Sequence, residues 1–516
     1  MTMIDFSQNY DTTKAYDEMF DVNGNVRDAY AEVFAVFKSM GMNEFDSRGE
    51  LRDKAFIDQG ITFSFSGEER PWPLDLIPRI ITASEWQIIE DGLIQRVQAL
   101  EMFLQDVYND QNVIEDGIVP RKVVVSSRHF HRQAHGFNPT NDVRIHVAGI
   151  DLIRDINGEF RILEDNLRSP SGISYVLENR NATSHLFPEI FKSKQIASVS
   201  EYPQRLLNSL ISSAPRGVAD PTVVVMTPGV HNSAYFEHAF LARHMGVELV
   251  EGRDLIVDDN KVFMKTTGSY KQVHVIYRRV DDDFIDPLHF ENGSMLGVAG
   301  IMNAARVGNV AIANAVGNGV ADDKLIYSYV PDLIKYYLGE EPKIKNVDTY
   351  RLDDPSVRKY CLENREKLVF KPVDASGGYG LVIGPHASEA ELEDIGKKVE
   401  EDPREYIAQP VIQLSTSPTY DGESISPRHV DLRPFVVNDG GKMWAVPGGL
   451  TRVALVKGSL VVNSSQGGGS KDTWVLEDEN VKEESLNDAQ AKARVAKGDE
   501  TSANSSQVQQ QAQQQQ

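Results

Sequence analysis

The sequence predicts a mixed α/β (α+β and α/β) protein of several domains. At 516 residues the chain is too long for a single hydrophobic core, so two or three domains are expected. Helical periodicity dominates the N-terminal region, and strand patterns alternate with helical ones farther along the chain. Hydrophobic residues make up 41% and charged residues 25%, which is typical of a soluble globular protein.

Residues 1–118 are expected to be mostly helical. Between Ile80 and Tyr108 the apolar residues recur at near-helical spacing. Thr82 or Ser84 is a candidate N-cap, and Glu85 suits the first turn of this helix. Upstream, three prolines are expected to interrupt regular structure: Pro71, Pro73 and Pro78.

Residues 119–215 form the next region, the metal-binding part of the predicted core. Its strand patterns begin at Lys122, in the runs KVVVSS, VRIHVAGIDLI and EFRILED. Residues 216–321 indicate a Rossmann-like α/β unit, in which a strand, a Pro-Gly turn and a helix are followed by further strands. A second α/β region occupies residues 322–479. Residues 480–516 are acidic and then Ser/Gln-rich, and this tail is expected to be disordered.

The charge balance is acidic: 53 basic and 76 acidic residues give a net charge of −23. Such a surface favours solubility or the attraction of cations such as polyamines and magnesium, and it disfavours binding to nucleic acid. The single cysteine, Cys361, excludes disulfides within the chain and Cys-rich zinc sites. No signal peptide and no run of about 18 apolar residues is evident, so we expect a cytoplasmic protein without a membrane partner.

The segment DLIRDINGEFRILEDN, from Asp151 to Asn166, carries the candidate metal site. Asn157-Gly158 between two alternating apolar runs predicts a type I′ hairpin. With that turn, Asp151 lies opposite Glu164, and Asn166 follows on the same face. Opposed carboxylates repel one another unless a cation lies between them. Because all three ligands are oxygens, they suit Mg²⁺ rather than zinc.

An exposed hairpin is the alternative, with Arg154 and Arg161 neutralising its carboxylates. The segment LRSPSG follows directly, and its Arg168 is placed to orient an anionic phosphate or carboxylate beside a metal. A simple turn into the next helix is the competing interpretation. Farther along, Arg278-Arg279 and the acidic residues 281–283 either line a substrate pocket or form surface charge, and surface charge is favoured.

A strand lysine, Lys371, precedes a glycine-rich loop. Glycines let backbone N–H groups approach phosphate oxygens, and the lysine supplies a positive charge. The loop is neither a Walker A loop nor a dinucleotide-binding turn, and an ordinary hairpin turn is the alternative. The loop residues expected to contact the nucleotide are Ser376, Gly377, Gly378 and Gly380.

Two further strand patterns complete the nucleotide half. Gln409 and Val411 lie on an apolar strand that is a plausible adenine-binding edge. Arg433 and Arg452 lie in strands rich in apolar residues, and a buried arginine needs an anionic partner. A triphosphate or an internal aspartate can provide that partner. A glycine cluster at 466–472 is either a lid over the site, which is favoured, or a linker.

Together these motifs resemble the ATP-grasp superfamily over roughly residues 15–476. Asp151, Glu164 and Asn166 match its D-x12-E-x-N metal signature, and Lys371 with the loop matches its lysine and glycine motif. Because the metal signature comes first here, the order resembles the circularly permuted ATP-grasp family often labelled glutathionylspermidine-synthase-like. Gln409 departs from the glutamate that many members carry.

The resemblance implies ATP and Mg²⁺ as cofactors and a carboxylate–amine (or thiol) ligase acting through an acylphosphate, on peptide or polyamine substrates. Mg²⁺ is expected on Asp151, Glu164 and Asn166, and an acyl substrate at Arg168. Phosphate charge is expected to be neutralised by four cations: Lys324, Lys371, Arg433 and Arg452. A small-molecule phosphotransferase and a non-catalytic ATP-binding protein are the alternatives. The sequence does not indicate the oligomeric state.

Overall fold

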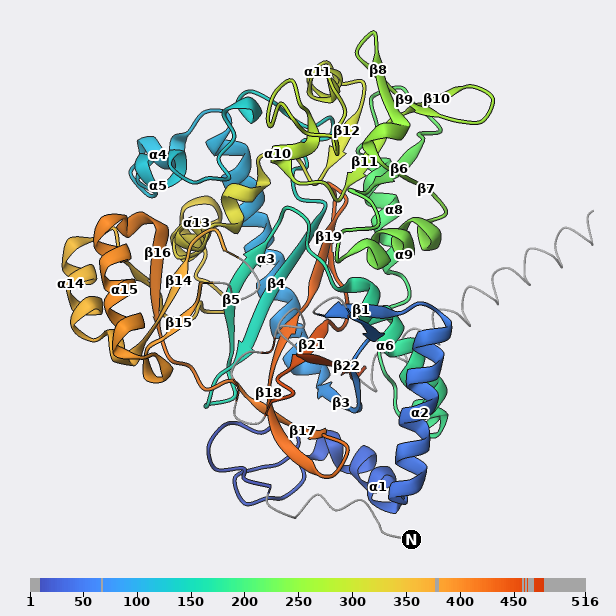
Figure 1. Cartoon of the computed structure of the whole chain (residues 1–516), viewed down its shortest axis with the longest axis vertical. Coiled ribbons are helices and arrows are strands. Elements are labelled where there is room, and N and C mark those ends of the chain that lie inside the picture. Colours follow the sequence, from blue (N-terminus) through green and yellow to red (C-terminus); the bar gives the residue numbers. More distant parts are fainter. Residues whose placement is uncertain are drawn as a thin grey trace, which may run out of the picture.

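The computed structural model describes residues 10–65, 68–375, 380–456, 459, 462 and 468–477. A nine-stranded sheet forms its centre, with a smaller lobe on one side and an α/β unit at one end (Figure 1). The predicted mixed α/β class is confirmed. No helix in the described ranges combines the length and the apolar character needed to cross a membrane.

The nine-stranded sheet is assembled from three distant parts of the chain. Its strands follow the order β20-β19-β4-β18-β21-β22-β3, with β5 paired to β4 and β17 paired to β18. Most neighbours are antiparallel, and β3 is parallel to β22. The strands are β3 (Leu74–Ile81), β4 (Val147–Arg154), β5 (Phe160–Asn166), β17 (Thr416–Tyr420), β18 (Ile425–Arg433), β19 (Phe435–Asn438), β20 (Met443–Ala445), β21 (Leu450–Val453) and β22 (Gly469–Val475).

The N-terminal region supplies one strand as well as helices. The predicted long helix is α3 (Ala83–Val107), which the Thr82–Glu85 capping box begins, and its buried face joins the core beside β4 and β19. Proline did not prevent a strand here: Pro78 lies within β3, which is an edge strand, where a missing N–H donor is tolerated. The other elements are α1 (Ala31–Ser39), α2 (Met42–Asp58), β1 (Thr62–Phe65), β2 (Glu68–Pro71) and α4 (Asn112–Glu115).

The predicted KVVVSS strand is wrong, because Arg121–Val125 forms a short helix, α5. The loops and helices around β4 and β5 then lead into α6 (Ile173–Leu186), which packs on β22. The connecting helices are α7 (Pro188–Ser193) and α8 (Tyr202–Ser212).

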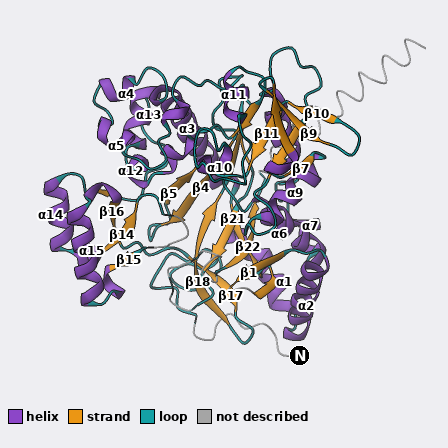
Figure 2. Cartoon of the chain, turned by 45° about the horizontal axis from the view of Figure 1, so that its top comes forward, coloured by secondary structure: helices purple, strands orange, loops and turns teal. Residues whose placement is uncertain are grey.

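The Rossmann-like unit contains a parallel sheet of order β12-β11-β6-β7. These strands are β6 (Val223–Met226), β7 (Glu248–Val250), β11 (Val275–Arg278) and β12 (Ala311–Ala313). A three-stranded antiparallel sheet, β10-β9-β8, extends from it, visible beside β11 in Figure 2. Its strands are β8 (Leu255–Asp258), β9 (Lys261–Lys265) and β10 (Tyr270–Val273), and the helices of the unit are α9 (Tyr235–Met245), α10 (Asp282–Ile285) and α11 (Ile301–Arg306).

The smaller lobe is a four-stranded sheet of order β13-β16-β14-β15, with α14 and α15 on its outer side (Figure 1). The strands are β13 (Tyr350–Arg351), β14 (Leu368–Pro372), β15 (Val382–Ile383) and β16 (Tyr406–Pro410). The helices of this lobe are α14 (Pro355–Glu363) and α15 (Glu389–Glu401). The preceding helices, α12 (Lys324–Tyr327) and α13 (Val330–Leu338), belong to the core that contains α3. The expected disordered tail at 480–516 lies outside the described residues.

Candidate active site

The β4–β5 hairpin places Asp151 directly opposite Glu164, as predicted. The turn differs from the prediction: Asp155 accepts a hydrogen bond from Gly158 N and pairs with Glu159, so the loop has three residues rather than two. Only Gly158 of that loop has a positive φ, whereas a type I′ turn needs two such residues. A β-bulge at Leu163 then restores the register between Asp151 and Glu164.

Two arginines on neighbouring strands neutralise Asp151. Arg433, at the end of β18, donates from Nε and Nη2 to the two carboxylate oxygens, the latter at 2.8 Å. Arg452, on β21, donates from Nη2 to Asp151 Oδ2 at 2.7 Å and also pairs with Asp431. Burial by itself would raise the pKa of Asp151, but Arg433 and Arg452 outweigh it and hold that pKa below its ordinary value. Asp151 is therefore an anion at neutral pH.

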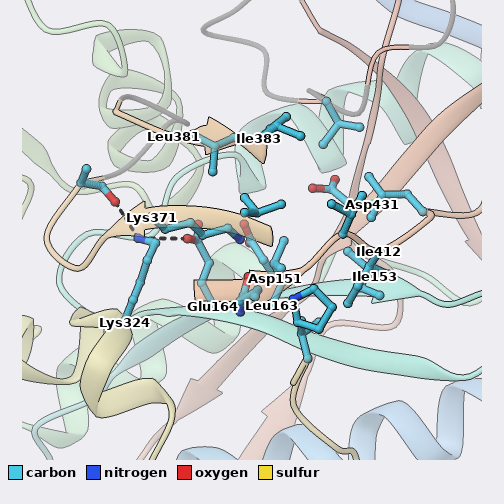
Figure 3. Close-up of a pocket in the computed structure, with 18 of the residues that line it drawn as sticks. Asp151, Ile153, Leu163, Glu164, Lys324, Lys371, Leu381, Ile383, Ile412 and Asp431 are labelled. Carbon is cyan, nitrogen blue, oxygen red and sulfur yellow. Dashed lines mark hydrogen bonds and ion pairs between the residues drawn. The ribbon is translucent and has the colours of Figure 1, made fainter. Parts of the chain in front are cut away.

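Glu164 meets two lysines from the smaller lobe and its neighbouring helix. Lys324 Nζ lies 3.3 Å from Glu164 Oε2 and donates to the Ala375 carbonyl at 2.6 Å (Figure 3). Burial lowers the pKa of Lys371 to about 8; the attraction of Glu164 opposes this change and the repulsion of Lys324 adds to it. Glu164 is thus paired with Lys324 and, at 3.8 Å, with Arg433 Nη2, and it also attracts Lys371. This corner of the site therefore has positive charge available for a further anion.

The same pocket has an apolar end. It lies between the smaller sheet and the nine-stranded sheet, and its apolar lining includes Ile153, Leu163, Val369 and Val411 (Figure 3). Gln409 also lines it, but the side-chain amide donates to Thr349 Oγ1 at 2.9 Å. The pocket therefore combines an apolar region with a cluster of cations, which are the two environments that a nucleotide requires.

The glycine-rich loop is only partly within the described residues. Ser376, Gly377 and Gly378 lie outside them. Gly380 has φ +71°, and an added Cβ there would lie 2.9 Å from Pro372 Cγ, so glycine is required by both conformation and space. Of the proposed lid at 466–472, the part from Gly469 to Asp472 is instead a buried strand, β22, of the main sheet.

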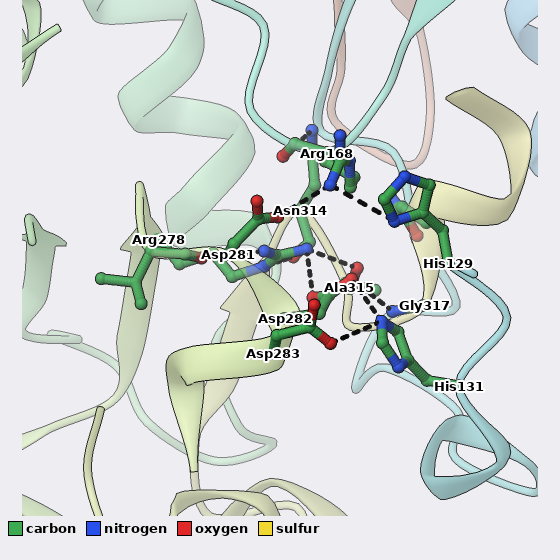
Figure 4. A network of polar contacts seen from close by, with 12 residues as sticks. His129, His131, Arg168, Arg278, Asp281, Asp282, Asp283, Asn314, Ala315 and Gly317 are labelled. Atoms are coloured by element: carbon green, nitrogen blue, oxygen red, sulfur yellow. Dashed lines mark hydrogen bonds and ion pairs between the residues drawn. The ribbon is translucent and has the colours of Figure 1, made fainter. Parts of the chain in front are cut away.

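Asn166 and Arg168 lie at the edge of a second, adjoining cavity. Asn166 is two residues beyond Glu164 on β5, about 6–7 Å along the strand. Arg168 donates from Nε to Asp322 Oδ2 at 2.8 Å and from Nη1 to Asp281 Oδ1 at 3.0 Å, and His129 lies beside it (Figure 4). Asn166 lines this second cavity and is not among the residues that line the pocket of Asp151 and Glu164. Its predicted place with them around one magnesium ion stays a prediction.

Several site residues were missed by the sequence reasoning. Asp431 lines the first pocket and shares Arg452 with Asp151; the DLR motif around Arg433 was the available signal. Arg279 and Asp281 line the second cavity, and Arg279 is only 5% exposed, so the interpretation as surface charge is wrong for it. Nothing in the linear pattern distinguished Arg279 from a surface charge.

The oxygen donors fit a magnesium ion that is also held by phosphates. Among the described residues, no group of three or more His, Cys, Asp or Glu side chains surrounds a common point. Mg²⁺ seldom uses such an all-protein cage and takes one or two carboxylates together with substrate phosphates. Glu164 meets that demand best, because its nearest cation, Lys324, is 3.3 Å away, whereas both oxygens of Asp151 already accept hydrogen bonds from arginines.

A pocket of cations and carboxylates between two β-sheets is the arrangement that the resemblance to the ATP-grasp superfamily implied. Residues 78–454 match the family described as circularly permuted ATP-grasp type 2, and the chain belongs to this family. The predicted permuted ATP-grasp fold is thereby confirmed. A glutathione synthetase-like effector from Globodera pallida, solved in its apo form, shares the fold with a TM-score of 0.56 and 10% identity, covering 85% of this chain and 98% of that one.

Similar sequences occur in several bacteria. An uncharacterized protein of Mycobacterium leprae is 60% identical over 90% of this chain and 82% of its own length. An uncharacterized protein of Synechocystis is 50% identical over 91% of this chain and 98% of its own length. A protein of Frankia alni named as a putative glutamate–cysteine ligase is 44% identical over 89% of this chain, which spans 54% of that relative.

Proposed function

We propose that the chain is a magnesium-ATP-dependent ligase that joins a carboxylate to an amine or a thiol through an acylphosphate. The observation that carries this proposal is the meeting of four cations with Asp151 and Glu164 at one end of a pocket that also has an apolar end. The cations are Lys324, Lys371, Arg433 and Arg452. The apolar end suits adenine, beside the Val411 backbone, and the charged end suits a triphosphate.

Each cation has a distinct position around the proposed triphosphate. Lys371 approaches from the smaller lobe and Lys324 from the neighbouring helix α12, whereas Arg433 and Arg452 approach from the main sheet. In the described structure they neutralise Asp151 and Glu164. Bound phosphates would take over part of this role, which frees carboxylate oxygens. Glu164 and Asp151 would then hold Mg²⁺, with Asn166 as the third oxygen donor. The ion, when bound, supplies charge neutralisation at the phosphates.

The reaction that follows from this arrangement has two steps. An oxygen of the substrate carboxylate attacks the γ-phosphorus, the bond from that phosphorus to the β,γ-bridging oxygen breaks, and ADP leaves. The amine or thiol then attacks the acyl carbon, inorganic phosphate leaves, and the proton of the nucleophile passes to solvent. The four cations stabilise the charge that develops on the transferred phosphoryl group, which is the main way proteins accelerate this chemistry. Arg168 would position the acyl substrate.

The experiment that tests the proposal offers hydroxylamine together with ATP, Mg²⁺ and a mixture of amino acids. A ligase of this kind releases ADP and forms a hydroxamate, because hydroxylamine intercepts the acylphosphate. Lys371→Ala is expected to reduce hydroxamate formation by at least about 100-fold through lost charge at the phosphates. Lys367→Ala is the matched control, since Lys367 is 70% exposed and, within the described part of the chain, pairs with Glu366 alone. A stable phosphoproduct would instead establish a kinase, and ATP binding without turnover would contradict catalysis.

A further inference from the structure

The sheet of the smaller lobe forms one wall of the nucleotide pocket. Gln409, on β16, lies directly opposite Val369 on β14, and the two strands are neighbours in that sheet (Figure 1). Because side chains alternate between the faces of a strand, Gln409 shares the pocket-facing side with Val369 and with Lys371. Lys371 is about 6–7 Å farther along β14. Gln409 therefore lies toward the end of the pocket proposed for the base, and Lys371 toward the end proposed for the phosphates.

A threonine beside this glutamine fixes one end of its amide. Gln409 Nε2 donates to Thr349 Oγ1 at 2.9 Å. Thr349 directly precedes β13, the strand that pairs with β16 on the side away from β14. The Thr349 hydroxyl has a single proton, which it donates to the Val347 carbonyl at 2.9 Å. Only the lone pairs of Oγ1 then face the glutamine, so the amide presents its N–H₂ group there.

A neighbouring hydrogen bond keeps the Thr349 hydroxyl turned toward Val347. The other hydroxyl near the Val347 carbonyl belongs to Tyr327, which donates to the Ile162 carbonyl at 2.7 Å and is 3.4 Å from the Val347 oxygen. Val347 is buried. If Thr349 turned its proton toward the glutamine, that carbonyl would keep only the 3.4 Å contact among the described residues. A buried carbonyl without a good partner is unfavourable.

The other end of the amide is open to the pocket. Gln409 Oε1 accepts no hydrogen bond from the described residues, and it is not one of their fully buried side-chain oxygens. It is an acceptor with no proton to donate. Adenine carries the N6–H₂ donor where guanine carries the O6 acceptor. Adenine can therefore bond to Oε1, whereas guanine would place two acceptors against each other, and such a mismatch excludes a ligand strongly.

We propose that Thr349 is a positioning residue that makes the pocket select adenine over guanine, because it holds the Gln409 amide with its carbonyl toward the base. This inference rests on the proposed function and identifies the residues that choose its nucleotide. Without the threonine, the amide could rotate by half a turn and offer its N–H₂ group to guanine O6. Thr349 does not itself line the pocket, so it acts on the base only through Gln409.

The test is calorimetric titration with the non-hydrolysable analogues AMPPNP and GMPPNP in the presence of magnesium. Wild type is expected to bind AMPPNP at least about tenfold more tightly than GMPPNP. Thr349→Val removes the hydroxyl, so the ratio of the two affinities is expected to fall toward onefold, chiefly because GMPPNP binds more tightly. Thr349→Ser retains the hydroxyl and should preserve the wild-type ratio. A general loss of stability would affect both analogues alike and leave the ratio unchanged.

A second pair of variants tests the amide itself. Gln409→Glu presents an acceptor in either orientation, so its preference for AMPPNP should not depend on Thr349. Adding Thr349→Val to Gln409→Glu is therefore expected to leave the ratio unchanged. Gln413→Glu is the matched control, because Gln413 is an exposed glutamine that does not line the pocket. In that background Thr349→Val should still abolish the preference.

Four results would overturn the inference. They are equal binding of the two analogues by wild type, an unchanged ratio in Thr349→Val, a loss in Thr349→Ser as large as in Thr349→Val, and an effect of Thr349→Val that persists in Gln409→Glu. Each of these leaves the proposed function standing, because a nucleotide still binds. Absence of magnesium-dependent binding of either analogue would refute the proposed function, and this inference with it.

Discussion

The lowered pKa of Lys371 gives nucleotide binding a distinctive pH dependence. Burial lowers this pKa to about 8, and a triphosphate beside the lysine would favour the ammonium and raise the pKa toward its ordinary value. In the proposed function, the protonated form of Lys371 is the one that binds the triphosphate. Affinity for Mg-ATP is therefore expected to be nearly constant up to about pH 7 and to fall above it, because the free protein must then take up a proton in order to bind.

The size of the effect follows from the free-state pKa. At pH 9 only about a tenth of the free protein carries a protonated Lys371, so the affinity is expected to be about tenfold lower than at pH 7. Binding at pH 9 should take up about 0.9 proton per nucleotide, against about 0.1 at pH 7. The phosphate groups of ATP titrate near pH 6, so they contribute no slope in this range.

Calorimetry in two buffers of different ionisation enthalpy measures both the affinity and the proton uptake. Lys371→Arg is the matched variant, since it retains the charge with a pKa above about 12. Its affinity is expected to be flat from pH 7 to pH 9. A wild-type affinity that does not change to pH 9, or a decline of equal steepness in Lys371→Arg, would refute the reasoning.

Two further predictions concern residues that contact the chain just after β5: Glu237, which accepts hydrogen bonds from Gly172 N and Ser174 N, and Gly149, which lies against Pro170. Glu237→Gln should destabilise the protein by about 3–5 kcal/mol, because it leaves the buried Arg279 without its anionic partner; a loss below about 1 kcal/mol in urea unfolding would contradict this role. Gly149→Ala should cost about 1–3 kcal/mol, since the new Cβ would lie 2.8 Å from Pro170 Cβ. Gly49→Ala in helix α2 is its control and should stabilise by about 0.5–1 kcal/mol; equal effects of the two substitutions in thermal unfolding would contradict the packing argument.

The pairing of Asp151 with Glu164 across the hairpin was predictable from sequence. The two-residue turn from which it was predicted, however, is not the turn that forms. The three-residue loop shifts the register by one residue relative to the predicted two-residue turn, and the bulge at Leu163 shifts it back. The strand pattern signals which face each residue occupies, but bulges leave no clear sign in an alternating sequence. The prediction succeeded because two local deviations cancel.

Other features depend on contacts between distant parts of the chain. Arg433 and Arg452 were expected to need anionic partners. Both pair with Asp151, which precedes Arg433 by 282 positions and Arg452 by 301 positions, and local sequence does not reveal such a distant partner. The β-branched run at Arg121–Val125 favours a strand by local preference, yet it forms a helix that packs into the core beside α12. The role of Arg279 was hidden for the same reason, since its partner Glu237 lies on a separate helix.

The central claim is that Glu164 and its neighbours hold the magnesium that binds the nucleotide. It is tested most directly by the thermal shift that ATP produces with and without Mg²⁺ in wild type, Glu164→Gln and the control Glu159→Gln, which changes an exposed hairpin carboxylate. At about 100 times Kd, Mg-ATP should stabilise the wild type by about 2.7 kcal/mol. We expect the magnesium-dependent part of that shift to disappear in Glu164→Gln and to persist in Glu159→Gln. An unchanged magnesium response in Glu164→Gln would contradict the account.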